Sequence, residues 1–466
     1  MTSRPATIGQ LRDSGWRSTP VKEEVRRNTA ARLAQGRPLL KGVLGYDETV
    51  LPQLQNALLA GHDVIFLGER GQAKTRIIRS LTGLLDEWVP VVAGSEVNDD
   101  PYHPISRYAR DLVVERGDET PVEWIGRDQR FGEKLATPDT SVADLIGEVD
   151  PIRVAEGRYL SDELTLHYGL LPRTNRGVFA VNELPDLAER IQVGLLNVLE
   201  ERDVQVRGYK VRLPLDVMLV ASANPEDYTN RGRIITPLKD RFGAQVRTHY
   251  PLDVATELDV VTQESTPLDV PGLRVGVPDF MSEIVGTLTH LARASSHVNQ
   301  RSGVSVRLSI TNHETLVANA ARRALRLGEK DAVPRISDLA ALASSTLGKV
   351  ELEPLEEGRE QHIVERLVSS AVLTVFKQRC SVVQLADVVL GFGEGTVVHV
   401  GEDVPSSAYA DVLGAVPALR APVMELAGSE TPAAVASATE LVLEGLHLSK
   451  RLNKEAVSGR SVYRGR

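Results

Sequence analysis

The sequence predicts an α/β fold, a parallel sheet with flanking helices, followed by an all-α domain and a C-terminal helical extension. From about residue 41 to 252, short runs of β-branched residues alternate with segments of helical periodicity, which is typical of a parallel sheet covered by helices. After Pro251 the apolar residues recur at spacings of three and four, and this spacing predicts amphipathic helices. A glycine-containing turn joins an apolar run to a helical pattern at residues 64–81.

The composition is that of an ordinary water-soluble protein with 42% hydrophobic residues. The single cysteine, Cys380, excludes an internal disulfide framework and favours a reducing compartment. No apolar run reaches the roughly 18 residues of a membrane span, and the N-terminus has no apolar signal segment. We therefore expect a cytoplasmic location and no membrane contact. The 54 basic and 63 acidic residues give a net charge of −9, which disfavours nonspecific binding to nucleic acid.

Five strands are expected in the α/β region, and their carboxyl ends should form the ligand-binding edge of the sheet. They span residues 62–68, 89–94, 176–183, 216–224 and 244–250. We expect four segments: an N-terminal helical arm (1–40), the α/β domain (41–252), a helical domain (253–385) and a C-terminal extension (386–466). In the extension, residues 390–419 are punctuated by glycine and proline and predict a connector, and a helix at about 431–453 precedes a tail expected to be disordered.

The loop after the first strand, "GERGQAKT", is similar to a phosphate-binding loop. Its backbone N–H groups can bind phosphate, Lys74 can reach the β- and γ-phosphates, and the Thr75 hydroxyl can bind magnesium. Ala73 stands where the usual motif has glycine, and we expect a negative φ there because alanine disfavours positive φ. An ordinary glycine turn before a helix is the alternative interpretation. The candidate binding residues are Gly68, Glu69, Arg70, Gly71, Gln72, Ala73, Lys74 and Thr75.

Two later strands end in polar residues that suit a nucleotide hydrolase. "RGVFAVNEL" ends in Asn182, at the position of a magnesium-associated aspartate, and Glu183, which can orient and deprotonate water. Asn182 lacks the negative charge that helps to hold a cation. "DVMLVASAN" ends in Asn224, which can bond the attacking water or the γ-phosphate, although Asn-Pro is also a common turn. The three strand ends together predict a phosphate-processing sheet.

These motifs resemble those of AAA+ ATPases, in the branch of MoxR proteins and the AAA+ subunit of magnesium and cobalt chelatases. In that branch an alanine before the lysine is usual, and the resemblance covers roughly residues 41–345. It implies ATP and Mg²⁺ as cofactors, with Thr75 and Asn182 on the metal side. It also implies a homo-oligomer, as a hexameric ring, that remodels or activates a partner protein. Asn182 departs from the family's usual aspartate, which puts magnesium affinity and turnover in question.

The same resemblance assigns two arginines. Arg241 in "LKDRFG" matches the arginine finger, which reaches the ATP of a neighbouring subunit, and Asp240 precedes it. Arg307 in "GVSVRLSI" matches the sensor-2 arginine of the helical lid domain. A surface ion pair at a helix end is the alternative for Arg241.

Two further segments have a functional and a plain interpretation. "EERDVQVRGYKVRL" alternates charged and apolar residues and predicts a hairpin. The family places this hairpin near a central pore, although a solvated face is at least as good an interpretation; its basic residues are Arg202, Arg207, Lys210 and Arg212. The segment "VNDDPYHP" could be drawn as a metal site, but its turn-forming residues favour a loop.

Three functions fit these observations. The first is a ring-forming ATPase, similar to the magnesium chelatase motor subunit, that acts on a protein with a von Willebrand factor A domain. The second is a nucleic-acid motor, which the acidic charge balance disfavours. The third is a nucleotide-binding scaffold that hydrolyses ATP weakly because of Asn182.

Overall fold

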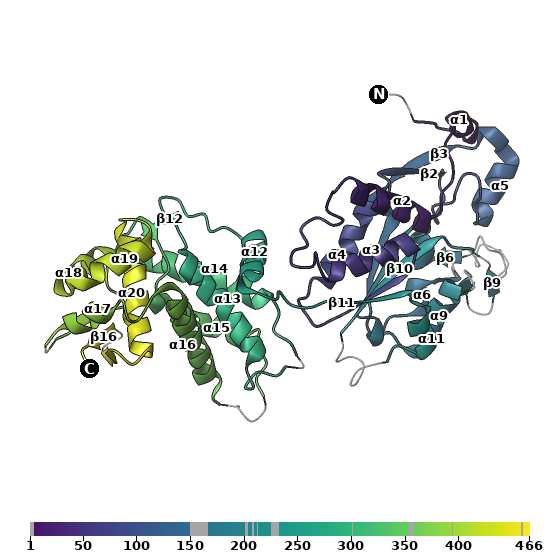
Figure 1. Ribbon diagram of the computed structural model, residues 1–466. Coiled ribbons are helices and arrows are strands. Elements are labelled where there is room, and N and C mark those ends of the chain that lie inside the picture. The colour runs from purple at the N-terminus through teal and green to yellow at the C-terminus, as the bar shows by residue number, and fades with distance from the viewer. Residues whose placement is uncertain are drawn as a thin grey trace. The chain divides into compact units, whose positions relative to one another are not determined.

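The computed structural model describes residues 4–149, 166–200, 204–206, 209–211, 213–224, 233–300, 302–353, 358–393, 395–457 and 460–466. The chain divides into two compact units, Met1–His249 and Tyr250–Arg466 (Figure 1). The sequence predicts the corresponding change after residue 252. Among the residues with described structure, no helix is long and apolar enough to cross a membrane.

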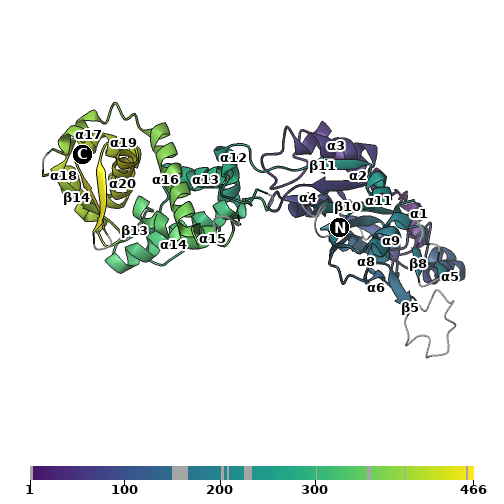
Figure 2. The same cartoon turned by 90° about the horizontal axis from the view of Figure 1, so that it is seen from below.

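A five-stranded parallel sheet forms the centre of the first unit (Figure 2). Its strands, in spatial order, are β11 (Ala244–Arg247), β1 (Val64–Leu67), β10 (Val217–Ala223), β7 (Gly177–Asn182) and β4 (Phe131–Leu135). Strand β7 is buried along its whole length, as expected for a strand covered on both faces. The predicted parallel sheet is therefore confirmed.

Alternate residues of the three central strands, β1, β10 and β7, serve two separate cores, as the two-residue period of a strand requires. Val64 and Phe66 pack on one face of the sheet, while Ile65 packs on the other. The first face is covered by α2 (Val21–Ala34), α3 (Val50–Ala60) and α4 (Lys74–Ser80). The second is covered by α8 (Leu170–Arg173), α9 (Glu189–Glu200) and α11 (Thr236–Arg241).

One predicted strand is not in this sheet. Residues 89–94 overlap β2 (Trp88–Val92), which pairs antiparallel with β3 (Val122–Gly126) in a separate two-stranded sheet. The fifth strand of the central sheet is instead β4. Its sequence, FGEKL, contains a glycine and two charged residues, because most of this edge strand is only partly buried. It therefore lacks the apolar run by which the other strands were recognised.

The N-terminal arm belongs to the first unit and contains the predicted helix as α2, after α1 (Ile8–Asp13). Val21 and Val25 enter the core against the sheet. Glu24 forms a buried, two-pronged ion pair with Arg130, with an Nη2–Oε2 distance of 2.6 Å. Such a pair is favourable only when both partners are fully bonded, and it fixes the arm on the α/β body.

Smaller elements complete the first unit. They are α5 (Arg107–Arg116), α6 (Val142–Leu145), the pair β5 (Gly147–Val149) and β6 (Leu166–Tyr168), and the pair β8 (Val204–Val206) and β9 (Tyr209–Val211). The antiparallel pairing of β8 with β9 confirms the predicted hairpin. Arg202, Arg207, Arg212 and the side chain of Lys210 lie outside the described residues, so the interpretation of their charges stays a prediction.

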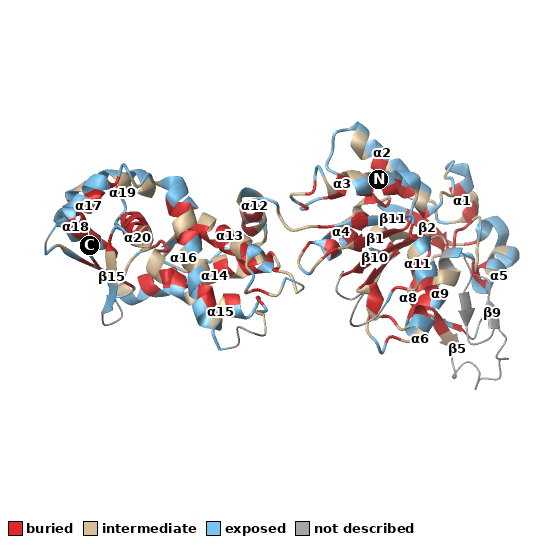
Figure 3. Cartoon of the chain, turned by 60° about the horizontal axis from the view of Figure 1, so that its bottom comes forward, coloured by how far each residue is buried: buried red, intermediate tan, exposed pale blue. Residues whose placement is uncertain are grey.

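The second unit is mainly helical. Its helices are α12 (Val254–Glu264), α13 (Asp279–Ala294), α14 (Arg307–Leu327), α15 (Leu342–Leu347), α16 (Glu360–Arg379), α17 (Ala386–Gly391), α18 (Tyr409–Ala415), α19 (Arg420–Ala427) and α20 (Pro432–Leu448). Helix α20 is buried along almost its whole length (Figure 3). One core joins α13 and α16 with α18, α19 and α20. Residues 253–385 and 386–466 therefore share a core rather than forming separate compact bodies.

Two expectations for the C-terminal extension are wrong. The expected connector, 390–419, contains strand β14 (Val397–Val400) and helix α18. The tail expected to be disordered contains β16 (Arg460–Arg464), which lies between β14 and β15 (Asn453–Val457) in an antiparallel sheet. The tail is ordered because Val462 and Tyr463 are buried, and the Tyr463 hydroxyl donates a hydrogen bond to Glu444 on α20.

Candidate functional site

The loop between β1 and α4 has two residues with left-handed backbone conformation. Gly71 has a φ of 76°, and Ala73 has a φ of 55°. The expected negative φ at Ala73 is therefore wrong: the residue caps α4 in the left-handed region. A single non-glycine residue there costs about 1–2 kcal/mol, and such strain persists only where the surrounding structure enforces it.

Buried side chains enforce this loop conformation. The Gln72 Oε1 atom accepts hydrogen bonds from the Glu69 N–H (3.0 Å) and the Thr248 hydroxyl (2.8 Å). The Tyr46 hydroxyl bonds the carbonyl oxygens of Gln72 (2.8 Å) and His249 (2.7 Å). Burial raises the pKa of Tyr46, so its hydroxyl stays a donor at neutral pH. Tyr46 and Thr248 are not among the residues predicted from the sequence, because neither lies in a recognisable motif.

Gly68 is required by close packing at the start of the loop. A Cβ atom there would lie 1.9 Å from the Thr248 hydroxyl and 2.2 Å from Gln72 Oε1. A pocket of about 320 Å³ adjoins this part of the loop. It is lined by Leu67, Gly68, Glu69, Gln72, Lys239, Gln245, Arg247 and Thr248.

Lys74 begins α4 and is buried, with 6% of its surface exposed. Its ammonium group donates to the carbonyl oxygens of Gly68 (2.5 Å) and Glu69 (2.8 Å) and to Asn224 Oδ1 (2.7 Å). The charge therefore lies inside the loop, directly beside the end of β10. Thr75 follows in the first turn of α4 and is exposed.

Glu183 follows β7 with a φ of 56°, so it is, like Ala73, a non-glycine residue with left-handed backbone. Its N–H donates to the Ser222 hydroxyl at 3.2 Å. Its Oε2 atom accepts a 2.6 Å hydrogen bond from Asn224 Nδ2. The Asn224 amide thus joins Lys74 on one side to Glu183 on the other, across three adjacent strands of the sheet. The structure brings these three predicted residues into one hydrogen-bonded chain.

Asn182 is buried at the end of β7 and contacts a carboxylate that the sequence analysis missed. Its Nδ2 atom donates to Glu133 Oε1 at 2.5 Å. Glu133 lies on β4, where Leu135 is opposite Asn182. A hydroxyl, an amide oxygen and a carboxylate are oxygen ligands of the kind that magnesium prefers. The side chains of Thr75, Asn182 and Glu133 therefore fit the chemistry of this cation.

The two predicted arginines belong to different units of the molecule. Arg241 ends α11 and forms an ion pair with Glu200, the last residue of α9. About half of its side chain is exposed, and the neighbouring Asp240 is exposed too. Arg307 begins α14 in the second unit and is also exposed. Arg241 is not linked to Lys74, Asn224 or Glu183 by a hydrogen bond between described residues.

The segment "VNDDPYHP" forms an ordered loop. Asp99 accepts hydrogen bonds from the N–H groups of Ile105 (2.6 Å) and Ser106 (2.8 Å) and from the Ser106 hydroxyl (2.6 Å). Asp100 lies 3.4 Å from the buried Arg176. His103 is largely exposed. These bonds fix the start of α5, in agreement with the loop interpretation.

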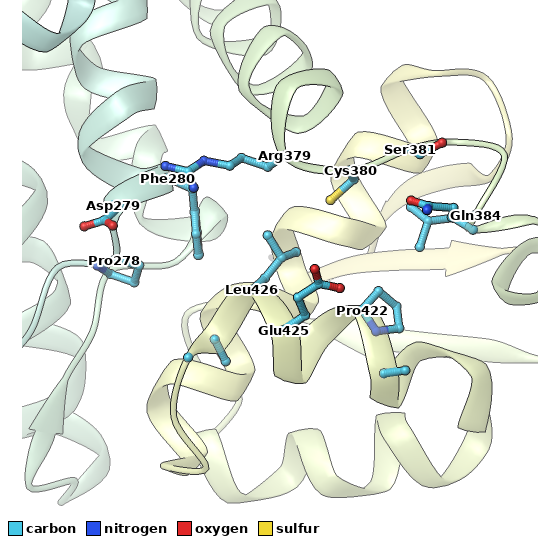
Figure 4. Close-up of a pocket in the computed structure, with 14 residues that line it drawn as sticks. Pro278, Asp279, Phe280, Arg379, Cys380, Ser381, Gln384, Pro422, Glu425 and Leu426 are labelled. Atoms are coloured by element: carbon cyan, nitrogen blue, oxygen red, sulfur yellow. The ribbon is translucent and has the colours of Figure 1, made fainter.

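A larger pocket, of about 790 Å³, lies in the second unit (Figure 4). Its wall includes Cys380, the single cysteine, with Glu425 nearby (Figure 4). Burial, with a smaller contribution from Glu425, raises the pKa of the Cys380 thiol to about 11. The thiol is therefore protonated at neutral pH, which makes it a poor nucleophile and metal ligand.

The chain is similar to several known proteins. The family model described as "Sigma-54 interaction domain" matches residues 156–241, a range that includes Asn182, Glu183, Asn224 and Arg241. The magnesium-chelatase subunit ChlI of Nostoc sp. is 30% identical over 231 residues, which cover 48% of this chain and 57% of that protein. The magnesium-chelatase 38 kDa subunit of Cereibacter sphaeroides is 27% identical over 332 residues, 66% of this chain and 90% of that protein.

The chain is an AAA+ protein of the magnesium-chelatase branch. This confirms the family inferred from the sequence. The AAA+ protein spans only 57% of the length of the Nostoc relative and 55% of a Chlamydomonas reinhardtii relative.

Solved structures similar to this AAA+ protein include a cryo-EM reconstruction of the complex between subunits BchI and BchD of magnesium chelatase. It has 23% identity and a TM-score of 0.35, and covers 67% of this chain and 95% of that chain. NtrX from Brucella abortus has 14% identity and a TM-score of 0.41, and covers 74% and 66%.

Proposed function

We propose that this AAA+ protein binds ATP with magnesium at residues 68–75 and hydrolyses it slowly. The observation that carries the proposal is the Asn224 side chain, which bonds Lys74 at 2.7 Å and Glu183 at 2.6 Å. Lys74, which we propose binds phosphate, and Glu183, which we propose acts as the base for water, bond the same amide. This is the arrangement that attack of water on a terminal phosphate requires.

Each of the three residues has a distinct role in this proposal. Lys74 exchanges its carbonyl partners for the β- and γ-phosphate oxygens of ATP. Glu183 accepts the proton of the attacking water, for which its half-buried carboxylate is suited. Asn224 orients that water or the γ-phosphate. Bound magnesium neutralises charge on the phosphates, and Thr75 and Asn182 are proposed to hold it. Slow turnover is expected because position 182, where the family has an aspartate, carries no charge itself.

The proposal includes assembly into a ring, which we take to be a hexamer by the resemblance to AAA+ proteins. In the ring, Arg241 leaves its ion pair with Glu200 and contacts the ATP of the neighbouring subunit. Partly exposed ion pairs contribute only about 0–1 kcal/mol, so breaking the ion pair with Glu200 costs little free energy. Arg307 is proposed to act as the sensor-2 residue of the lid domain, residues 253–385, within a hydrolysis cycle coupled to motion of that domain.

We further propose that the motion remodels or activates a partner protein with a von Willebrand factor A domain, as the resemblance to MoxR and chelatase subunits implies. A cytoplasmic location belongs to the same proposal. The relatives that support it are named as magnesium-chelatase subunits. Co-purification of this AAA+ protein with the product of an adjacent gene for such a partner, dependent on ATP, would test this part.

Steady-state phosphate release tests the hydrolysis. We expect slow, measurable release by the wild type and none above background for Lys74→Ala and Glu183→Gln. Glu189→Gln is the matched control, since Glu189 is an exposed carboxylate six residues further along the chain. Undiminished release by both site variants would refute the site assignment.

Mixing two inactive variants tests the role of Arg241. Arg241→Ala subunits retain a complete site for nucleotide, and Lys74→Ala subunits retain the arginine. If Arg241 acts on a neighbour's ATP, mixed rings recover part of the phosphate release. Absence of recovery, with ring formation confirmed by light scattering, would argue against an action between subunits.

A further inference from the structure

Glu133 is the feature of the proposed site that no motif explains. It lies on β4, next to β7, and its Oε1 atom accepts the 2.5 Å hydrogen bond from Asn182 Nδ2. Its Oε2 atom accepts a 2.8 Å hydrogen bond from Arg79 Nε. About 20% of the Glu133 side chain is exposed. The carboxylate therefore lies partly exposed directly beside the residue that lacks the expected charge.

We propose that Glu133 supplies the negative charge on the magnesium side of the site that Asn182 cannot supply. The proposal rests on the proposed function, because it concerns the same bound nucleotide. It assigns Glu133 as a cation-binding or cation-positioning residue, and it assigns Asn182 as the residue that orients Glu133.

The chemistry of the pair fixes the orientation of the Asn182 amide. A carboxylate has only acceptor atoms, so the amide must present its Nδ2 atom to Glu133. The Asn182 Oδ1 atom then faces the Ser222 hydroxyl, at 3.4 Å. The Asn182 amide thus links Glu133 on β4 to Ser222 on β10.

The same contact explains why asparagine suits position 182. An aspartate there would place a second carboxylate within hydrogen-bonding distance of Glu133. Like charges at that distance cannot both be ionised without a large cost. The pair of Asn182 and Glu133 carries one negative charge, as a single aspartate would, and that charge lies on the neighbouring strand.

The position of Arg79 relates Glu133 to the loop. Thr75 and Arg79 are four residues apart on α4, and residues with this spacing lie on the same face of a helix. The face that carries the Thr75 hydroxyl therefore also carries the guanidinium that contacts Glu133. The Arg79 side chain is 64% exposed, so it is a weakly held partner that a divalent cation can replace.

Titration of nucleotide binding with Mg²⁺ tests the proposal by a readout other than turnover. The probe is a fluorescent N-methylanthraniloyl ATP analogue, measured without Mg²⁺ and at increasing Mg²⁺. The Mg²⁺ midpoint is the Mg²⁺ concentration that gives half of the full change in binding of the analogue. We expect Glu133→Gln to raise this midpoint about 10- to 100-fold, the usual effect of losing such a partner. Binding of the analogue without Mg²⁺ should stay unchanged.

Arg79→Gln is the matched control, because it breaks the same ion pair but leaves the carboxylate. It should leave the Mg²⁺ midpoint equal to or lower than that of the wild type. The double variant Glu133→Gln/Asn182→Asp moves the negative charge from β4 to β7. If one carboxylate at either position serves the cation, its Mg²⁺ midpoint should lie within about threefold of the wild-type value.

Asn182→Asp alone is a second test if Glu133→Gln does not fold. Two carboxylates then share the site, and one of them has a raised pKa. The Mg²⁺ midpoint should fall as the pH rises from 6 to 8, more steeply than in the wild type.

Three results would overturn the proposal while the proposed function stands. The first is a Mg²⁺ midpoint in Glu133→Gln equal to that of the wild type. The second is a rise of the Mg²⁺ midpoint that is equally large in Glu133→Gln and Arg79→Gln. The third is a pH dependence of the Mg²⁺ midpoint in Asn182→Asp that equals that of the wild type. A wild-type protein that binds no analogue at any Mg²⁺ concentration would instead refute the proposed function and this inference with it.

Discussion

Buried polar side chains gather in both units of the molecule, but they are held in different ways. In the first unit, Lys74, Asn224 and Glu183 meet at the ends of three strands, and Glu183 has left-handed backbone. In the second unit, Glu440 is fully buried in the regular helix α20, where it accepts hydrogen bonds from the Ser337 N–H (2.7 Å) and the Tyr409 hydroxyl.

We interpret this difference as one between polar groups that are proposed to serve chemistry and polar groups that serve folding. Strained backbone and side chains that bond one another at the end of a sheet are typical of functional sites. Burial raises the pKa of Glu440, and its bonds offset the cost of burial without strain. We therefore expect substitutions in the first unit to change turnover, and equivalent substitutions in the second to change stability.

Among the substitutions that compare the two units, Asn224→Ala should have the largest effect, and that effect is on turnover. Removal of the amide that joins Lys74 to Glu183 should lower phosphate release about 100-fold, the usual effect of losing one pre-positioned polar group. The free energy of unfolding should change by less than about 1 kcal/mol, since Lys74 keeps its two carbonyl partners. Unchanged turnover would mean that Asn224 is only a turn residue.

Asn312→Ala is the same substitution in the second unit and should have the opposite pattern. The Asn312 amide is fully buried and bonds Thr346 (3.1 Å) and Ser345 (2.6 Å). Leaving these hydroxyls without the amide should cost about 2 kcal/mol. Denaturation followed by circular dichroism should show this loss. Turnover per folded molecule should stay within about twofold of the wild-type value. A larger change would contradict the distinction between the two units.

The stability contributed by Glu257, on α12, should depend on pH. Burial disfavours its charge, but the His290 imidazole at 3.6 Å and the hydrogen bonds from Arg293 and Ser309 outweigh burial and hold its pKa below the ordinary value of 4.5. A lowered pKa stabilises the folded state above the unfolded-state pKa, and this stabilisation is lost as the pH falls through the folded-state pKa. Glu257→Gln should cost about 1.5 kcal/mol at pH 7.

The cost of Glu257→Gln should shrink as the pH falls below about 4.5, the ordinary pKa of the group. Urea denaturation of both proteins at several pH values measures it. A cost that grows as the pH falls would contradict the assigned charge.

The smallest expected effect is that of Ala73→Gly. Glycine removes the strain of the left-handed conformation but gives the unfolded chain more freedom. The balance should stabilise the protein by about 0.5 kcal/mol. Ala31→Gly is the matched control, because Ala31 is exposed within the regular helix α2; it should destabilise by about 1 kcal/mol. Equal effects in thermal melting would contradict the strain at Ala73.

The sequence allowed prediction of those parts of the site that lie at the ends of apolar strands. Strands β1, β7 and β10 have long buried runs, so Lys74, Glu183 and Asn224 could be placed after them. Glu133 could not be found in this way, because β4 is a partly exposed edge strand with few apolar residues. The conformation of Ala73 also escaped prediction, since it depends on Gln72 and its distant partners.

The C-terminal tail shows the same limit. Its sequence is polar and rich in glycine, and the order of Tyr463 depends on a hydrogen bond to Glu444, nineteen residues earlier, on α20. Local composition therefore predicted disorder where tertiary packing imposes a strand. The predicted roles of Arg241 and Arg307 depend on a neighbouring subunit and on nucleotide, and they stay predictions.

The central claim is that Lys74 holds the phosphates of ATP, and equilibrium binding of ATP with Mg²⁺ tests it most directly. Isothermal titration calorimetry should show binding by the wild type and by Glu183→Gln with similar affinity. Lys74→Ala should bind about 100-fold more weakly, which is a loss of about 2.7 kcal/mol in binding free energy. Lys22→Ala is the control, since Lys22 pairs with Asp63 just before β1, at the opposite end of that strand from the loop. Binding by Lys74→Ala as tight as that of the wild type would contradict the account.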